Sequence, residues 1–404
     1  MINLNPKYKP LLNSDSRYII TTGGRGSGKS FTINTMILLL TFEEGHNILF
    51  TRYTMTSAYT SIIPEFLEKI EMLGLEDQFE VNRTEITNKV TGNRIYFKGL
   101  KTGSGNQTAA LKSLSGITCW VCDEAEEIPE EELFDKIDLS IRTKGVHNKV
   151  ILVMNPATKE HWIYKRFFES RGIPAGANTT SKDTTYIHTS YLDNIHNLDE
   201  SFLNQIEEIK IRRPEQYRLV IMGGWREIAE GVIFTNWELG EFRSQGIDIW
   251  GMDFGFSNDE NSLVKTSIDK KNKRIYLKEY LYQTGLVTSE LANIARKHAN
   301  NDLIIGDSAE PRLLHEMKHN FNLNIIPTVK GAGSVSFGIA LMQDYQLIID
   351  PTSTNLVKEL NNYVWNDKKS ETPLSNGFDH ILDSVRYAVS YQLANPNAGN
   401  YFFN

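Results

Sequence analysis

Short apolar runs alternate with longer amphipathic stretches through the first half of the chain. Each short apolar run is bounded by polar or glycine residues, which is typical of a buried strand, and helices are expected in the stretches between them. This alternation predicts an α/β domain built on a parallel sheet. Strands are expected at 18–20, 47–51, 117–122 and 149–154, helices at 31–42 and 57–73, and a hairpin from two β-like runs, 79–90 and 94–99.

The second half of the chain has a different pattern. Residues 170–200 are polar without a clear period, a helix is expected at 201–211, and Gly223-Gly224-Trp225 interrupts the pattern, so we place a domain boundary there and expect domains at 1–222 and 223–404. Three antiparallel strands, a helix and a further strand follow, which is the element order of the ribonuclease H-like fold. These elements are expected at 247–253, 262–268, 274–282, 289–298 and 303–306, with a last helix at 378–393.

Residues 23–30 match the phosphate-binding loop pattern G-x-x-x-x-G-K-[ST] between a predicted strand and a predicted helix. Glycines let backbone N–H groups turn inward around phosphate oxygens. Lys29 can reach the β- and γ-phosphates, the Ser30 hydroxyl can bind Mg²⁺, and the helix amino end would face the phosphates. We therefore expect an ATP site formed by Gly23, Gly24, Arg25, Gly26, Ser27, Gly28, Lys29 and Ser30.

Two adjacent acids end the predicted strand at 117–122. Asp123 would hold Mg²⁺, and Glu124 would orient and deprotonate the attacking water, which indicates a nucleotide hydrolase. The separation from Lys29 leaves room for a strand between the two motifs, as in the ASCE group of phosphate-loop enzymes. Asn155, after the next strand, is expected either to sense the γ-phosphate or to cap the turn before Pro156.

Other polar residues of this half leave alternatives open. Arg25 in the loop or Arg142 between the last two strands can stabilise transition-state charge, in cis or across a subunit boundary. The segment 101–116 is rich in Gly, Ser, Thr and Lys, so it is either a ligand- or DNA-contacting loop or an ordinary polar connection.

Three aspartates occupy ordered positions in the second half. Asp253 ends the first strand, Asp307 follows the fourth, and Asp383 lies on the last helix. Such carboxylates can converge on two divalent ions, about 3.5–4 Å apart, that activate water and stabilise the leaving oxygen of a phosphodiester. We expect these three residues to be the catalytic ligands of Mg²⁺ or Mn²⁺ in a nuclease.

The composition of the chain limits the kinds of partner that we expect it to bind. The formal net charge is −7 over 404 residues, so a nucleic acid would be bound through local patches with weak long-range steering. The longest apolar run, 36–40, is too short to cross a bilayer, and the first ten residues hold no apolar signal segment. We expect a cytoplasmic protein without a membrane partner.

Two motifs are better explained by structure than by chemistry. Cys119 and Cys122 have C-x-x-C spacing, but they lie on a predicted buried strand and the chain has no other cysteine for a zinc site. His315-Glu316-Met317-Lys318-His319 matches H-E-x-x-H, but the continued metalloprotease pattern fails at Asn322. We expect two core thiols and a polar helix face.

Taken together, the motifs resemble the large terminase subunit of tailed bacteriophages, an ATP-driven DNA packaging motor with a fused nuclease. The resemblance covers nearly the whole chain and includes 23–30, Val121-Cys122-Asp123-Glu124, Gly224-Trp225, 252–256, 306–311 and 379–388. It implies that Lys29, Ser30 and Asp123 bind Mg-ATP, that Glu124 is the hydrolytic base, and that Asp253, Asp307 and Asp383 bind Mg²⁺ or Mn²⁺ with His380 as an accessory.

The resemblance also implies double-stranded DNA, a portal protein and a small terminase subunit as partners. The chain would form a homo-oligomeric ring on the procapsid in the host cytoplasm, pump DNA and cut concatemers. Lys330, in a Gly- and Ser-rich loop, would either contact DNA phosphate or be solvated. Two other interpretations stay open, a helicase or repair-type ATPase fused to a nuclease, and an assembly protein whose nuclease half is inert.

Overall fold

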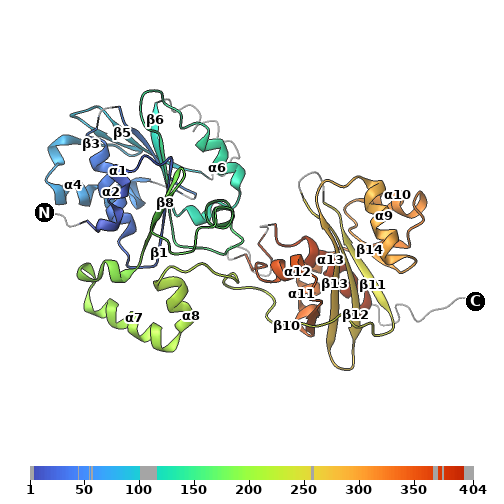
Figure 1. The fold of residues 1–404 in the computed structure, drawn as a ribbon. Helices are drawn as coiled ribbons and strands as arrows, with labels where there is room; N and C mark the ends of the chain where they lie inside the picture. Colours follow the sequence, from blue (N-terminus) through green and yellow to red (C-terminus); the bar gives the residue numbers. More distant parts are fainter. Residues whose placement is uncertain are drawn as a thin grey trace, which may run out of the picture. The chain divides into compact units, whose positions relative to one another are not determined.

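The computed structural model describes residues 4–43, 45–53, 55, 58–100, 116–255, 259–366, 372–374 and 377–394. The chain divides into two compact units, Met1–Glu227 and Ile228–Asn404 (Figure 1). This division falls slightly after the predicted one because Trp225 is buried in the core of the first unit. The predicted loop at 101–116, apart from Gly116, and Phe256 lie outside the described residues.

A nine-stranded sheet in the order β3-β4-β5-β2-β6-β7-β1-β9-β8 forms the first unit. The strand β7 lies between β1 and β6 and pairs in parallel with both, so an additional strand separates the two predicted motifs, as expected. The strands are β1 (Tyr18–Gly23), β2 (Asn47–Arg52), β3 (Phe79–Val81), β4 (Glu85–Asn88), β5 (Arg94–Gly99), β6 (Ile117–Asp123), β7 (Lys149–Met154), β8 (Thr179–Ser181) and β9 (Thr184–Thr189).

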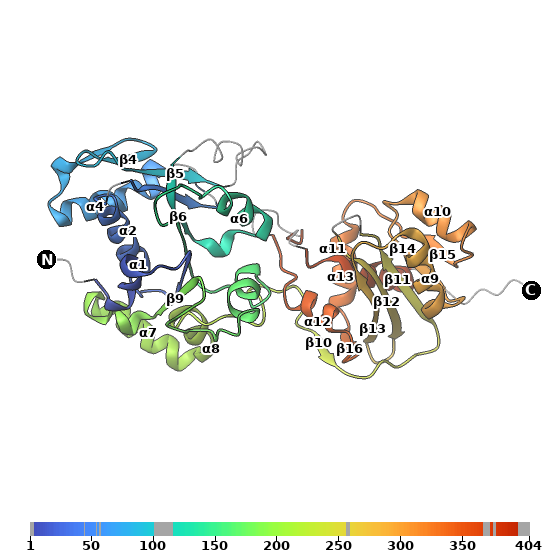
Figure 2. The ribbon, with the colours of Figure 1, turned by 45° about the horizontal axis from the view of Figure 1, so that its top comes forward.

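Alternate side chains of the central strands enter two cores, one on each face of this sheet. Cys119 and Val121 pack with α2 and α4, and Trp120 and Cys122 pack with α6, on the opposite face (Figure 2). The helices are α1 (Pro10–Asn13), α2 (Lys29–Leu40), α3 (Ala58–Ser61), α4 (Ile63–Leu73), α6 (Glu131–Asp138), α7 (Glu200–Arg212) and α8 (Pro214–Gln216), with π-helical turns at Tyr164–Glu169 and Tyr217–Ile221.

Two predictions for this unit need correction. The β-like run at 79–90 is two antiparallel strands, β3 and β4, and the expected hairpin is formed by β4 and β5. The polar stretch 170–200 contains β9, which pairs with β1 along its full length. Its threonines are buried because other side chains satisfy their hydroxyls; for example, Tyr8 bonds Thr189 at 2.7 Å.

The second unit has a seven-stranded sheet in the order β10-β16-β13-β12-β11-β14-β15. The strands β11, β12 and β13 are antiparallel and β14 pairs in parallel with β11, as the predicted ribonuclease H-like order requires. The elements are β10 (Trp237–Leu239), β11 (Asp248–Asp253), β12 (Asn261–Asp269), β13 (Arg274–Gln283), β14 (Ile304–Gly306), β15 (Ile325–Pro327), β16 (Gln346–Ile349), α9 (Thr288–Ala299), α10 (Pro311–His319), α11 (Ser334–Gln343), α12 (Thr354–Leu360) and α13 (His380–Ala394).

A close approach fixes α13 against this sheet. A β-carbon at Gly251 would lie 1.8 Å from the carbonyl oxygen of Ser384, so only glycine fits at this point of β11. Since Asp253 lies two residues further along the same face of β11, the approach brings α13 next to Asp253.

Among the described residues, no helix is long and apolar enough to cross a membrane.

Candidate active sites

The loop between β1 and α2 borders a pocket of about 200 Å³, lined by residues 24–31 and Asn155. Gly26 and Gly28 have φ of +78° and +74°, in the left-handed region that favours glycine. The back of the loop is tightly packed, because a β-carbon at Gly24 would lie 1.8 Å from the carbonyl oxygen of Ile221. All predicted loop residues therefore line the pocket except Gly23, whose carbonyl faces Lys29 instead.

Lys29 is buried at the base of this pocket, and burial lowers its pKa to about 8. Four oxygens lie within hydrogen-bonding distance of its ammonium group, the carbonyls of Gly23 (2.8 Å) and Gly24 (3.1 Å), Ser27 Oγ (3.3 Å) and Asn155 Oδ1 (3.0 Å), and its three N–H groups are shared among them. Hydrogen bonds to neutral oxygens offset only part of the cost of removing a cation from water, so the site favours the binding of an anion beside Lys29.

Asp123 and Glu124 lie at the carboxyl end of β6, where Arg52 from β2 joins them. Both Arg52 Nε (2.9 Å) and Nη2 (2.6 Å) donate to Asp123 Oδ2, and Glu124 Oε2 lies 3.7 Å from Arg52 Nε. Glu124 has φ of +54°, a backbone conformation that is costly for a residue with a side chain and that turns this carboxylate off the strand. Partial burial raises the pKa of Glu124.

Asn155 follows β7 beside the loop and contacts Glu126, for which no role was predicted from the sequence. Glu126 Oε1 accepts from the Asn155 backbone N–H (3.2 Å) and from Asn155 Nδ2 (3.3 Å). Burial raises the pKa of Glu126 to about 7. Its acidic neighbours Glu131 and Glu132 are exposed, so only the fold distinguishes it from them.

The two arginine candidates lie at opposite ends of the strands. Arg25 is exposed and lines the pocket. Arg142 is exposed in the connection before β7, next to Thr143, whose hydroxyl donates to the first residue of β6. Because the strands β6 and β7 are parallel, Arg142 is at the end remote from the pocket.

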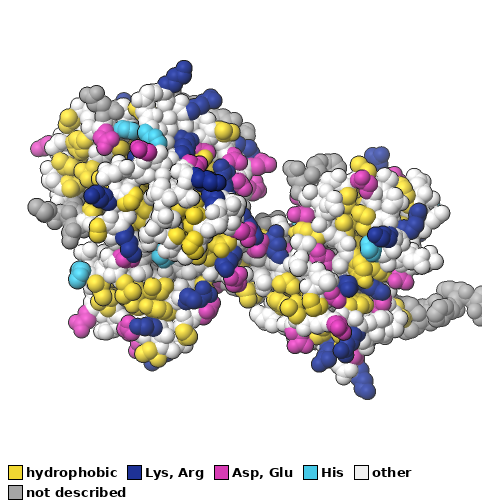
Figure 3. All heavy atoms as spheres, in the orientation of Figure 1, with side chains coloured by type: hydrophobic (Ala, Val, Ile, Leu, Met, Phe, Trp, Pro, Cys, Tyr) yellow, Lys and Arg dark blue, Asp and Glu magenta, His cyan; other side chains and the backbone are white. Residues whose placement is uncertain are grey.

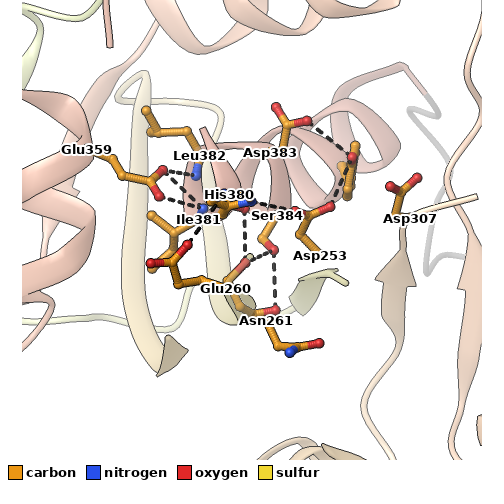
Figure 4. A network of polar contacts seen from close by, with 12 residues as sticks. Asp253, Glu260, Asn261, Asp307, Glu359, His380, Ile381, Leu382, Asp383 and Ser384 are labelled. Atoms are coloured by element: carbon orange, nitrogen blue, oxygen red, sulfur yellow. Dashed lines mark hydrogen bonds and ion pairs between the residues drawn. The ribbon is translucent and has the colours of Figure 1, made fainter. Parts of the chain in front are cut away.

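In the second unit, the structure brings Asp253 and Asp383 together. The Tyr387 hydroxyl donates to Asp253 Oδ1 (3.3 Å) and to Asp383 Oδ2 (3.2 Å). Asp307 follows β14, the strand next to β11 (Figure 4). Burial raises the pKa of Asp253, and the charges of Asp383 and Asp307 raise it further.

Each of the three carboxylates has a cationic partner. His380 Nδ1 lies 3.5 Å from Asp253 Oδ2, Arg386 Nη2 donates to Asp383 Oδ2 at 2.7 Å, and Lys330 forms an ion pair with Asp307. In this structure Lys330 is therefore paired with an acid, so it is neither simply solvated nor available to contact a DNA phosphate. With these partners in place, no group of three His, Cys, Asp or Glu side chains in the described ranges is arranged to hold a metal ion.

His380 and the start of α13 are held by two further acids that the sequence analysis missed. His380 Nε2 lies 3.5 Å from Glu260 Oε2, and the carboxylate of Asp253 raises the pKa of His380 to about 9. Glu359 of α12 is fully buried and accepts the backbone N–H groups of Ile381 and Leu382 (Figure 4). It thereby caps a helix that carries Asp383.

The two remaining motifs are structural. Cys119 and Cys122 are free thiols on opposite faces of β6, as predicted. His315 and His319 are exposed on α10 with ring centroids 4.3 Å apart. On the face shown in Figure 3, acidic and basic side chains are interspersed over each unit, in keeping with the small net charge.

Comparison with protein families gives two matches in chain order. Residues 15–224, just over half of the chain, match a family described as phage terminase large subunit, and residues 253–391 match a terminase RNase H-like domain. The large terminase subunit of Bacillus phage SPP1 is 28% identical over 399 residues, with 92% of this chain and 90% of that protein covered.

Two further relatives cover most of the chain. The PBSX phage terminase large subunit of Bacillus subtilis (strain 168) is 25% identical over 423 residues and covers 97% of this chain and 94% of its own length. A solved large terminase from a thermophilic bacteriophage is 17% identical, with 97% of this chain and 100% of that chain covered and a TM-score of 0.47.

Proposed function

The chain belongs to the phage terminase large subunit family, and from that premise we propose that it hydrolyses ATP to move double-stranded viral DNA into a procapsid and cuts concatemeric DNA. Its first unit is a terminase ATPase domain and its second an RNase H-like nuclease domain. The observation that carries the proposal is the presence of two separate polar sites in one chain, the Lys29 pocket and the Asp253–Asp383 pair.

The ATPase pocket fits nucleotide phosphates. Among the described residues, the hydrogen-bond partners of Lys29 are neutral oxygens, and the left-handed glycines Gly26 and Gly28 turn the backbone around the cavity. Ser30 and Asp123 would hold Mg²⁺, which supplies charge neutralisation at the β- and γ-phosphates when bound. Glu124 takes the proton of the attacking water, and Asn155 contacts the γ-phosphate from the end of β7.

The nuclease unit supplies carboxylates suited to a hard divalent cation, which would displace their present cationic partners on binding. The carboxylates of Asp253, Asp307 and Asp383 are the oxygen ligands that Mg²⁺ and Mn²⁺ prefer, and burial, followed by the charges of Asp383 and Asp307, raises the pKa of Asp253. Asp253, Asp307 and Asp383 would hold the metal, which would supply an activated water and charge neutralisation at the leaving oxygen of the phosphodiester. His380 holds Asp253 in place from the first turn of α13.

The partners follow from the proposed activity. Double-stranded DNA is the substrate of both units, and a portal protein and a small terminase subunit are the proposed protein partners. The chain is proposed to work as a homo-oligomeric ring in the host cytoplasm. Because Arg142 is remote from the pocket of its own subunit, it could act only on the pocket of a neighbouring subunit.

Two variants of the full chain test the division of labour. Lys29→Ala removes the ammonium group from the pocket and is expected to abolish ATP hydrolysis while plasmid cleavage with Mn²⁺ continues. Asp253→Ala is expected to abolish plasmid cleavage and to leave ATP hydrolysis intact. Loss of both activities in either folded variant would contradict two independent sites.

A displacement assay separates the motor from a helicase. With ATP, the protein is expected to displace a third strand from a triplex on intact duplex DNA and to leave a forked duplex paired. Unwinding of the fork would favour the helicase interpretation instead. Metal-dependent cleavage by the same preparation, abolished by EDTA, would exclude an inert nuclease unit.

A further inference from the structure

Glu126 is a half-buried acid in the turn Ala125–Glu127 after β6, and it contacts Asn155, which lines the nucleotide pocket. One carboxylate oxygen, Oε1, accepts two hydrogen bonds from Asn155, one from the backbone and one from the side chain. The other, Oε2, is buried without a hydrogen-bond partner among the described residues. An orphaned buried carboxylate oxygen is costly, so its presence here points to a role.

The partners of Asn155 fix the orientation of its side-chain amide. The ammonium group of Lys29 can only donate, so it must face Asn155 Oδ1, at 3.0 Å. Glu126 Oε1 already accepts the Asn155 backbone N–H, so this oxygen is an acceptor and faces the donor Asn155 Nδ2. The amide group of asparagine has two N–H donors, so one remains for a phosphate oxygen while Glu126 holds the other.

We propose that Glu126 is a positioning residue for ATP hydrolysis, which holds the Asn155 amide with its oxygen toward Lys29 and one N–H free for the γ-phosphate. The inference rests on the proposed ATPase function. It connects Lys29, through Asn155, to the turn that begins next to the proposed base Glu124. Without Glu126, the amide of Asn155 can rotate and lose this alignment.

Steady-state ATP hydrolysis by the full-length protein tests the inference. Glu126→Ala is expected to lower kcat about tenfold to a hundredfold, as loss of alignment of a catalytic contact does. Binding of a fluorescent ATP analogue should weaken less than about threefold, because the loop and Lys29 supply most of the contacts. Glu126→Gln keeps an acceptor oxygen and is expected to fall between wild type and Glu126→Ala.

A double-mutant cycle identifies the residue through which Glu126 acts. In an Asn155→Ala background, Glu126→Ala should lower kcat by less than about twofold. Glu132→Ala, from the same acidic run but with a side chain 73% exposed, is the matched control and should leave kcat unchanged. Should Glu126→Ala fail to fold, Glu126→Gln carries the same cycle.

Four outcomes would overturn the inference. Unchanged kcat in Glu126→Ala, or an equal loss with and without Asn155, shows that Glu126 does not act through Asn155. Full activity of Asn155→Ala removes the contact that Glu126 would position, while leaving the ATPase assignment intact. Wild-type protein that neither binds the analogue nor hydrolyses ATP would refute the proposed function as well.

Discussion

Glu359 holds the first turn of the helix that carries Asp383, and removing it should open that turn. Its carboxylate accepts from Ile381 N–H at 3.1 and 3.0 Å and from Leu382 N–H at 3.0 Å, in a fully buried position. Glu359→Ala leaves two buried N–H groups without an acceptor, at about 1–3 kcal/mol each. Burial also raises the pKa of Glu359 to about 8, so relief of that burial offsets part of the loss.

We expect the free energy of opening this turn to fall by about 2–4 kcal/mol, which corresponds to a rise in amide exchange of at least about thirtyfold. Hydrogen exchange of peptides spanning 380–386 in the full chain measures it directly. Plasmid cleavage should fall with it, because the turn positions Asp383 and His380, and ATP hydrolysis should not change.

Glu310→Ala is the matched control for this experiment. Glu310 also stands at the start of a helix, α10, but makes no side-chain capping bond. Its removal should leave exchange at 380–386 unchanged. Exchange in Glu359→Ala within twofold of wild type would refute the assignment of Glu359 as the cap of α13.

Three further predictions concern single residues. Burial lowers the pKa of His161 to about 4, so the unfolded chain binds the proton more tightly and stability should be lost as pH falls from about 6.5 toward 4. At pH 5 the loss should be about 2 kcal/mol, measured as a lower urea midpoint. This loss should shrink in His161→Asn but not in His315→Asn, a control at an exposed site. Because Lys330 competes with metal for Asp307, Lys330→Ala should lower the Mn²⁺ concentration for half-maximal cleavage about two- to fivefold, and an unchanged metal dependence would contradict this. Gly251→Ala should cost about 1–3 kcal/mol of stability and reduce cleavage, since its β-carbon meets Ser384, whereas Gly331→Ala, which has open space, should do neither.

The sequence predicted an element or a site correctly where the local order of residue types allows a single structural explanation. The glycine-lysine loop, the acids after an apolar strand and the alternation of β6 all predicted their elements, because each depends on local spacing. The strand β9 was missed because three of its six residues are buried threonines. Their burial depends on partners such as Tyr8 and Ser16, which are about 170 or more positions away in sequence.

Two buried or half-buried acids could not be predicted from the sequence for the same reason. Glu126 lies in an acidic run and Glu359 follows Lys358 in the chain, and nothing local distinguishes a buried carboxylate from a solvated one. Only the packing of β7 beside β6, and of α12 beside α13, gives them backbone N–H partners. Arg52 and Lys330 likewise find Asp123 and Asp307 through the fold.

The buried thiols of β6 provide a reporter for one half of the molecule. The chain has only Cys119 and Cys122, both in the first unit and at most 1% exposed, and burial raises the pKa of each. A thiol reagent can therefore label the intact chain only when the central strand of the ATPase unit opens, whatever the nuclease unit does. Since a ligand of the folded state lowers the population of open molecules, ATP at a hundred times its dissociation constant should slow labelling about a hundredfold. The rate at which two inert cysteines react would thus measure nucleotide affinity without any turnover.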